Sequence, residues 1–135
     1  MLVLEHEMTY SDQQKVVLRN AIENNIYVAD IKNSGMPTNL MEAYIELRKY
    51  GYDIEYLEDH KLGLLSITYL DCIKELARNN IDIYQLIYGD SFIPYTNRQI
   101  LTITDGLLKG LDLRLFGNIK YDCIEMRNII NSIAS

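Results

Sequence analysis

The chain repeats a short apolar pattern four times, and this repeat limits the fold more than any other feature. Each copy starts from a Gly or Asn, and the starting residues Asn25, Gly51, Asn80 and Gly110 are spaced about 26–30 residues apart. Apolar residues follow one, three and six positions later. They are Ile26, Tyr52, Ile81 and Leu111; Val28, Ile54, Ile83 and Leu113; and Ile31, Leu57, Leu86 and Phe116. This spacing is typical of small helical repeats.

A stretch with helical spacing of apolar residues precedes each starting residue and recurs at the C-terminus. The pattern predicts helices near residues 11–24, 39–50, 68–79, 97–109 and 122–134. Each predicted start carries a short polar residue with an acid or amide three positions later, the spacing of a capping box. The pairs are Ser11 with Gln14, Asn39 with Glu42, Thr68 with Asp71, Thr96 with Gln99, and Asp122 with Glu125.

The starting residues predict where these helices end. Gly and Asn tolerate the left-handed conformation that closes a helix, and Asp53, Asp82 and Asp112 are placed to cap a second helix of about two turns. One such unit cannot bury its apolar face alone, so the units must stack. We expect a single all-α domain over residues 1–135, a small solenoid-like stack of about four and a half helix-turn-short-helix repeats. The expected repeats are 9–35, 36–63, 64–91 and 92–119, with a half-repeat at 120–135.

The segment at 97–129 carries a family resemblance. Gln99, Ile103, Gly106 and Leu107, followed by Gly110-Leu111-Asp112-Leu113, are similar to the repeat Gln-Met-x-x-Ile-x-x-Gly-Leu-x-x-Gly-Leu-Asp-Val-x-x-Tyr-Ala-Asn-Pro. That repeat occurs in arrays in proteins of Firmicutes and their mobile elements, and its role is largely unassigned. Earlier copies depart from it, since Leu40 and Tyr69 replace the Gln. The resemblance implies a helical array and brings no catalytic residues.

Charge and composition restrict the partner classes and the compartment. The formal net charge is -6, so the electropositive surface of a nucleic-acid binder is missing. Glu5 and Glu7 interrupt any apolar signal sequence, and no apolar run approaches the length of a membrane span. Cys72 and Cys123 are too few for a disulfide framework. We therefore expect a cytoplasmic protein with reduced cysteines and no direct contact with nucleic acid or membrane.

The sequence contains no arrangement typical of catalysis. His6 and His60 each lie beside acids, but adjacent residues do not converge on one metal ion, and the helical pair of zinc-binding histidines is missing. Nucleotide-binding and nucleophile motifs are also missing. We expect no enzyme activity, no cofactor and no metal.

The second repeat has the most unusual surface composition. Its tyrosines and acids suit an interface with a basic protein. The candidate residues are Tyr44, Tyr50, Tyr56, Glu55, Glu58 and Asp59. Tyrosines that simply rim the core are the structural alternative. The leading hypothesis is a non-catalytic protein–protein interaction protein, in its sharper form a phage or mobile-element inhibitor of a host defence nuclease, similar to anti-CRISPR proteins, that binds a basic nucleic-acid enzyme. The rival is an intracellular structural or assembly protein that self-associates through its open solenoid ends, where an apolar helix face is left.

Overall fold

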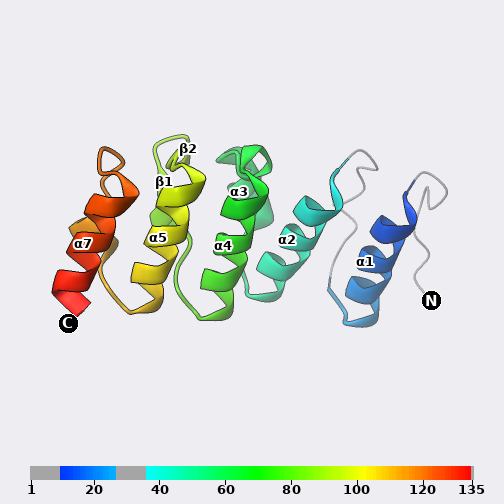
Figure 1. The fold of residues 1–135 in the computed structure, drawn as a ribbon. Coiled ribbons are helices and arrows are strands. Elements are labelled where there is room, and N and C mark those ends of the chain that lie inside the picture. The colour runs from blue at the N-terminus through cyan, green and yellow to red at the C-terminus, as the bar shows by residue number, and fades with distance from the viewer. Residues whose placement is uncertain (1–9, 27–35, 135) are drawn as a thin grey trace. The chain divides into compact units, whose positions relative to one another are not determined.

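The computed structural model describes residues 10–26 and 36–134. The described chain is mostly helical (Figure 1), which confirms the all-α class. Its residues form two compact units, Met1–Ile54 and Glu55–Ser135, called unit 1 and unit 2 below. The expected core residues Val28 and Ile31, and His6, lie outside the described residues.

Unit 1 contains α1 (Asp12–Glu23) and α2 (Thr38–Lys49). The two helices pack against each other and exclude solvent completely from three large side chains. These are Leu18, Met41 and Leu47. The side-chain amide of Gln14 donates a 2.6 Å hydrogen bond to the carbonyl oxygen of Met36. This bond ties the first turn of α1 to the segment that leads into α2.

Unit 2 holds three long helices that pack in chain order, α4 on α5 and α5 on α7 (Figure 1). The short helix α6 contacts both α5 and α7. The unit begins within α3, whose first residue is the last of unit 1. The helices are α3 (Ile54–Asp59), α4 (Ile67–Arg78), α5 (Asn97–Leu108), α6 (Leu113–Phe116) and α7 (Cys123–Ala134). Two single 3-10 turns complete the helical structure, η2 (Leu62–Leu64) and η3 (Tyr84–Leu86).

The four predicted helix ends share one backbone geometry. Asn25, Gly51, Asn80 and Gly110 have φ angles of 60°, 90°, 59° and 82°. In each turn the next residue donates its N–H to the carbonyl oxygen five residues back, at 2.9–3.2 Å. The pairs are Ile26 with Ala21, Tyr52 with Leu47, Ile81 with Leu76, and Leu111 with Gly106. This bond defines the Schellman motif, so the predicted left-handed closure is confirmed.

Three of the five predicted capping boxes are confirmed. In each, the side chain at the N-cap accepts from the backbone N–H three residues later, and the side chain there accepts in return. These pairs are Ser11 with Gln14, Thr96 with Gln99, and Asp122 with Glu125.

The other two predicted caps are wrong, because the N-cap of each helix lies two residues earlier than expected. Pro37 precedes α2 with φ -58°, close to the value that its ring imposes, and no side chain caps the helix. Asn39 therefore lies inside α2. Ser66 caps α4 by accepting from the N–H of Tyr69 at 3.1 Å, so Thr68 also lies inside its helix.

The short second helices are shorter than the two turns expected. α3 has six residues, η3 three and α6 four. Asp112 is the N-cap of α6, whereas Ile83 stands at the N-cap of η3; the side chains of Asp82 and Asp112 each accept from the N–H two residues later at 2.9 Å. In these copies the apolar pattern positions three and six residues after the starting residue are buried. They are Ile54, Ile83 and Leu113 at the first position and Leu57, Leu86 and Phe116 at the second. The position directly after the starting residue is half-buried in all four copies.

A small hairpin follows η3, where the sequence predicts only a loop. β1 (Ile87–Tyr88) and β2 (Ser91–Phe92) pair antiparallel with Tyr88 opposite Ser91. Gly89 has φ +65° in the connecting turn, a conformation that glycine adopts without strain. The backbone N–H of Phe92 donates to the carbonyl oxygen of His60 at 3.1 Å, so the hairpin is fixed to the segment after α3.

Candidate protein-interaction site

The predicted site residues divide between the two units. Tyr44 and Tyr50 belong to unit 1. Tyr44 lies in the core of α1 and α2 with 4% of its surface exposed, so its side chain is not available to a partner. Tyr50 is exposed at the end of α2, and the ammonium of Lys49 lies 5.8 Å from its ring centroid. The sequence had placed Tyr44 on the interface; the structure gives it the core role typical of an amphipathic tyrosine.

The other four predicted residues lie together on α3, and we call them the α3 patch: Glu55, Tyr56, Glu58 and Asp59. All four are exposed. The helix carries no basic residue, so its exposed charge is uniformly negative. Asp53, directly before the helix, adds a further acid in sequence.

Contacts on two sides hold the ring of Tyr56 in place. The ring of Tyr84 meets it edge-on at 5.4 Å between centroids, and the ring of His60 lies tilted over it at 4.2 Å. Nδ1 of His60 donates to the carbonyl oxygen of Tyr56 at 2.8 Å, which fixes the imidazole. The backbone N–H of Tyr84 donates to the carboxylate of Asp82 at 2.9 Å, which helps to position Tyr84. Because its rotamer is restrained before binding, the exposed Tyr56 ring loses little entropy when a partner covers it.

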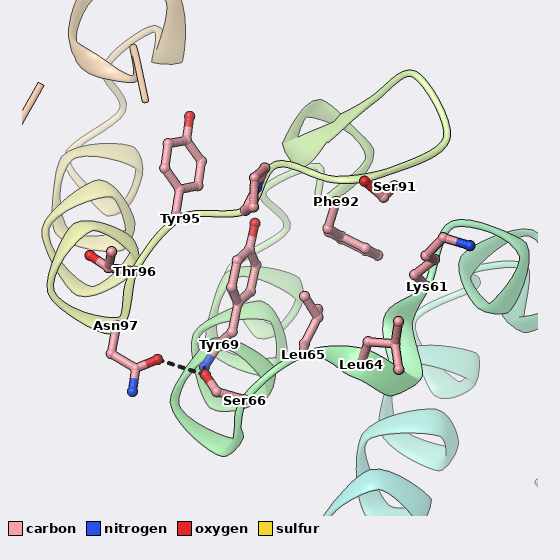
Figure 2. A pocket seen from close by; sticks show the side chains of 11 residues that line it. Lys61, Leu64, Leu65, Ser66, Tyr69, Ser91, Phe92, Tyr95, Thr96 and Asn97 are labelled. Carbon is pink, nitrogen blue, oxygen red and sulfur yellow. Dashed lines mark hydrogen bonds between the residues drawn. The ribbon is translucent and has the colours of Figure 1, made fainter. Parts of the chain in front are cut away.

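A cleft in unit 2 is a second candidate binding feature that the sequence did not reveal. Its volume is about 340 Å³. Figure 2 shows Phe92, Leu65 and Tyr69 around its centre, with Lys61 and Leu64 at one end and Asn97 at the other. Its walls come from two segments, residues 61–69 and 91–97. The only sequence signal was the apolar run Leu62-Gly63-Leu64-Leu65 in a stretch between helices.

Hydrogen bonds fix the aromatic side chains of the cleft. The hydroxyl of Tyr69 donates to the carbonyl oxygen of Ile93 at 2.8 Å, and that of Tyr95 donates to the carbonyl oxygen of Gly117. Burial raises the pKa of Tyr69 well above its usual range and raises the pKa of Tyr95 to about 12. Both phenols therefore stay neutral donors. Since both side chains are buried and their hydroxyls are already bonded, they form a rigid wall of the cleft and offer a ligand little surface.

The remaining chemistry of the described residues is limited. Across residues 10–26 and 36–134, no group of three His, Cys, Asp or Glu side chains is placed to hold a metal ion. No helix in the same ranges is long and apolar enough to cross a membrane. Both cysteines are free, and burial raises the pKa of the Cys72 thiol. A protonated buried thiol is a weak nucleophile.

Comparisons with known proteins place no further constraint on these features. No protein-family model, no curated protein and no solved structure matches the chain.

Proposed function

We propose that this chain is a non-catalytic protein–protein interaction protein of the cytoplasm. In this proposal its repeated units stack as a small solenoid-like array, and the α3 patch is the primary contact surface. The observation that carries the proposal is Tyr56, which is 43% exposed, held by two aromatic neighbours and set among three acids. Restrained, exposed tyrosines are common anchors of protein interfaces.

The charge of the α3 patch indicates the class of partner. Glu55, Glu58 and Asp59 favour a basic protein surface, because opposite potentials steer association and exclude partners of like charge. Basic surfaces are typical of enzymes that bind nucleic acids. We therefore propose a defence nuclease of a bacterial host as the target, which makes the protein an inhibitor of the anti-CRISPR type encoded by a phage or mobile element.

Partner capture with matched charge variants tests the proposal. The tagged protein is used to capture partners from lysate of a low-GC bacterium. The test variant carries Glu55→Lys, Glu58→Lys and Asp59→Lys. The control variant carries Glu23→Lys, Glu42→Lys and Asp90→Lys, three exposed acids outside the patch, so both variants change the net charge equally. We expect a basic protein to be captured by the wild type and the control and lost with the test variant.

Kinetics on the captured protein separate the roles of charge and ring. The triple lysine variant should slow association and weaken its salt dependence, since rim charges act mainly on the encounter rate. Tyr56→Ala should instead speed dissociation and weaken the binding free energy by up to about 2 kcal/mol if the ring is an anchor. Wild-type rates in both variants would exclude the α3 patch as the contact.

A phage challenge tests the inhibitor hypothesis directly. Expression of the protein in a bacterium with an active CRISPR nuclease should restore plaque formation, and the triple lysine variant of the α3 patch should not. Full immunity in the presence of the wild-type protein would contradict inhibition of that nuclease.

Self-association is the second candidate, and it rests on the outer side of α7. Ile133 on α7 is 39% exposed, whereas Leu107, the residue at the same distance from the N-cap in α5, is buried. A second copy that covers Ile133 would complete the burial. Sedimentation of the wild type and of Ile133→Asp over a concentration series tests this. A mass that stays monomeric at all concentrations would exclude it.

A further inference from the structure

We propose that the cleft beside Lys61 is a docking site for a peptide segment of the protein partner in which a carboxylate lies next to a large apolar side chain. This inference rests on the proposed interaction function and adds a second contact to the α3 patch. The carboxylate would lie beside the ammonium of Lys61, and the apolar side chain would pack on Leu64 and Leu65 in the cleft wall.

The backbone of Lys61 is the first observation. Among the described residues, positive φ angles occur at Asn25, Gly51, Lys61, Asn80, Gly89 and Gly110. All but one of these are Gly or Asn, which tolerate this conformation. Lys61, with φ +71°, closes α3 at a cost that Asn or Gly would avoid. A strained residue retained at a cleft points to a role for its side chain in binding.

The charge of Lys61 is the second observation. Other lysines of unit 2 form ion pairs within the unit. Lys74 pairs with Asp71 at 3.3 Å, and Lys109 pairs with Asp105 at 3.2 Å. Lys61 is exposed and forms no ion pair with the part of the chain that the structure describes. Among the described residues that line the cleft, it is the only charged one. A ligand carboxylate there meets one positive charge and no acid of this described lining.

The apolar part of the cleft is the third observation. Leu64 stands at the rim with 81% of its surface exposed, although Leu62, two residues earlier, is fully buried. The cleft floor contains Tyr69 and Phe92, whose rings meet edge-on at 6.1 Å. Both rings are almost completely buried, so they hold their positions without a ligand. A side chain that enters the cleft covers Leu64 and the half-buried Leu65, and the buried rings hold the wall behind them in place.

Binding of short peptides, followed by NMR, tests the inference with the intact chain. The probes are the blocked dipeptides acetyl-Asp-Phe-amide, acetyl-Asn-Phe-amide and acetyl-Asp-Ala-amide. Backbone amide shifts should concentrate in residues 61–69 and 91–97. The Asp-Phe probe should bind up to about fivefold more tightly than the Asn-Phe probe, the upper end of the range expected for one exposed ion pair. The Asp-Ala probe, which lacks the phenyl group, should bind more weakly than the Asp-Phe probe.

Two variants separate the charge of Lys61 from its conformation. Lys61→Asn removes the ammonium and suits the positive φ, so we expect a higher melting temperature together with loss of the preference for Asp over Asn. Lys120→Asn removes one charge from an exposed loop outside the cleft and should keep that preference. The raised melting temperature excludes unfolding as the cause of the loss.

Three outcomes of these experiments would overturn the inference. Shifts absent from residues 61–69 and 91–97, equal affinity for the Asp and Asn probes, or an equal effect of Lys120→Asn would do so. Tighter binding of free 3-phenylpropanoate than of any dipeptide would assign the cleft to a small-molecule acid instead of a peptide. If the dipeptides do not bind while partner capture still depends on the α3 patch, the proposed function stands and the cleft inference fails. If the dipeptides bind and no partner is captured, the cleft remains a peptide site and the proposed function fails.

Discussion

Gly106 of α5 lies directly against the ring of Phe116 in α6: a Cβ at Gly106 would come within 2.7 Å of Phe116 Cζ and 2.9 Å of Ile130 Cδ1. Both neighbours are completely buried. The missing side chain thus allows α6 and α7 to approach α5 closely.

Gly106→Ala should therefore destabilise the protein, although alanine is the better helix former. The added methyl group must displace two buried side chains, which costs about 1–3 kcal/mol. The gain in helix propensity offsets at most about 1 kcal/mol of this. Urea unfolding at pH 7 measures the difference. An unchanged or increased free energy of unfolding would show that α6 and α7 can shift without cost.

The helices and their ends were predictable because their signals are local. A Schellman turn needs a Gly or Asn at one position and an apolar residue after it, and both are visible at Gly51 and Gly110 without knowledge of the fold. The error at α2 arises because Pro37, which offers no capping side chain, sets the start of the helix, and the error at α4 arises where two capping candidates lie close together. Ser66 and Thr68 are both acceptable N-caps, and the packing of the helix decides between them.

The residues of the α3 patch lie on one short helix and are close together in sequence, whereas Tyr44 and the cleft were predicted less well. Tyr44 lies three residues from both Met41 and Leu47, so helical spacing alone places it on the buried face of α2. Its assignment to an interface overlooked that signal. The cleft forms only where residues 61–69 pack against residues 91–97, and no local sequence pattern predicts this contact. The positive φ of Lys61 was also hidden, because lysine is not a residue typical of that conformation.

The side chain of Gln99 provides a second prediction. Its amide Nε2 donates to the carbonyl oxygens of Ile119 at 2.9 Å and Tyr121 at 2.8 Å, and it is 8% exposed. Gln99→Glu places a carboxylate oxygen against these two acceptors and should cost about 2–3 kcal/mol at pH 7.

The pH dependence of this variant has a definite sign. Burial and the facing carbonyl oxygens raise the pKa of the introduced carboxyl in the folded state above its unfolded value of about 4.3. A protonated carboxyl can donate, so stability is retained below the unfolded pKa and lost as the pH rises through the folded pKa. The deficit should be smaller at pH 4 than at pH 7 in urea unfolding. Gln99→Met, which loses the same bonds without a charge, should show a deficit independent of pH.

A third prediction compares two isoleucines in the same turn. Ile83 is completely buried, so Ile83→Ala should cost about 2–5 kcal/mol through loss of apolar contact and the cavity that remains. Ile81 is half-buried, and Ile81→Ala should cost less because solvent can fill the space. Chemical unfolding of both variants gives the comparison. Equal losses would contradict the packing described here.

The last prediction concerns the ion pair between α5 and α7. The guanidinium of Arg127 bonds to the carboxylate of Asp105, and Lys109 lies 3.2 Å from the same oxygen. Arg127 first, and Lys109 second, hold the pKa of Asp105 below its usual range. Because the folded pKa is lowered, the pair stabilises the protein above the unfolded pKa of about 3.9, and this contribution is lost as the pH falls through the folded pKa.

Asp105→Asn should therefore lower the free energy of unfolding at pH 7 and make it less dependent on pH below about pH 4. The side chains of Asp105 and Arg127 are both 40% exposed, so solvent screens the pair and the loss should stay below about 1 kcal/mol. Arg127→Gln should remove most of the same slope, and the double variant should add little to either single one, since the two residues share one interaction. Unfolding followed from pH 7 to pH 2 measures all three variants. A slope equal to the wild type in Asp105→Asn would show that this carboxylate is not bound more tightly in the folded protein than in the unfolded chain.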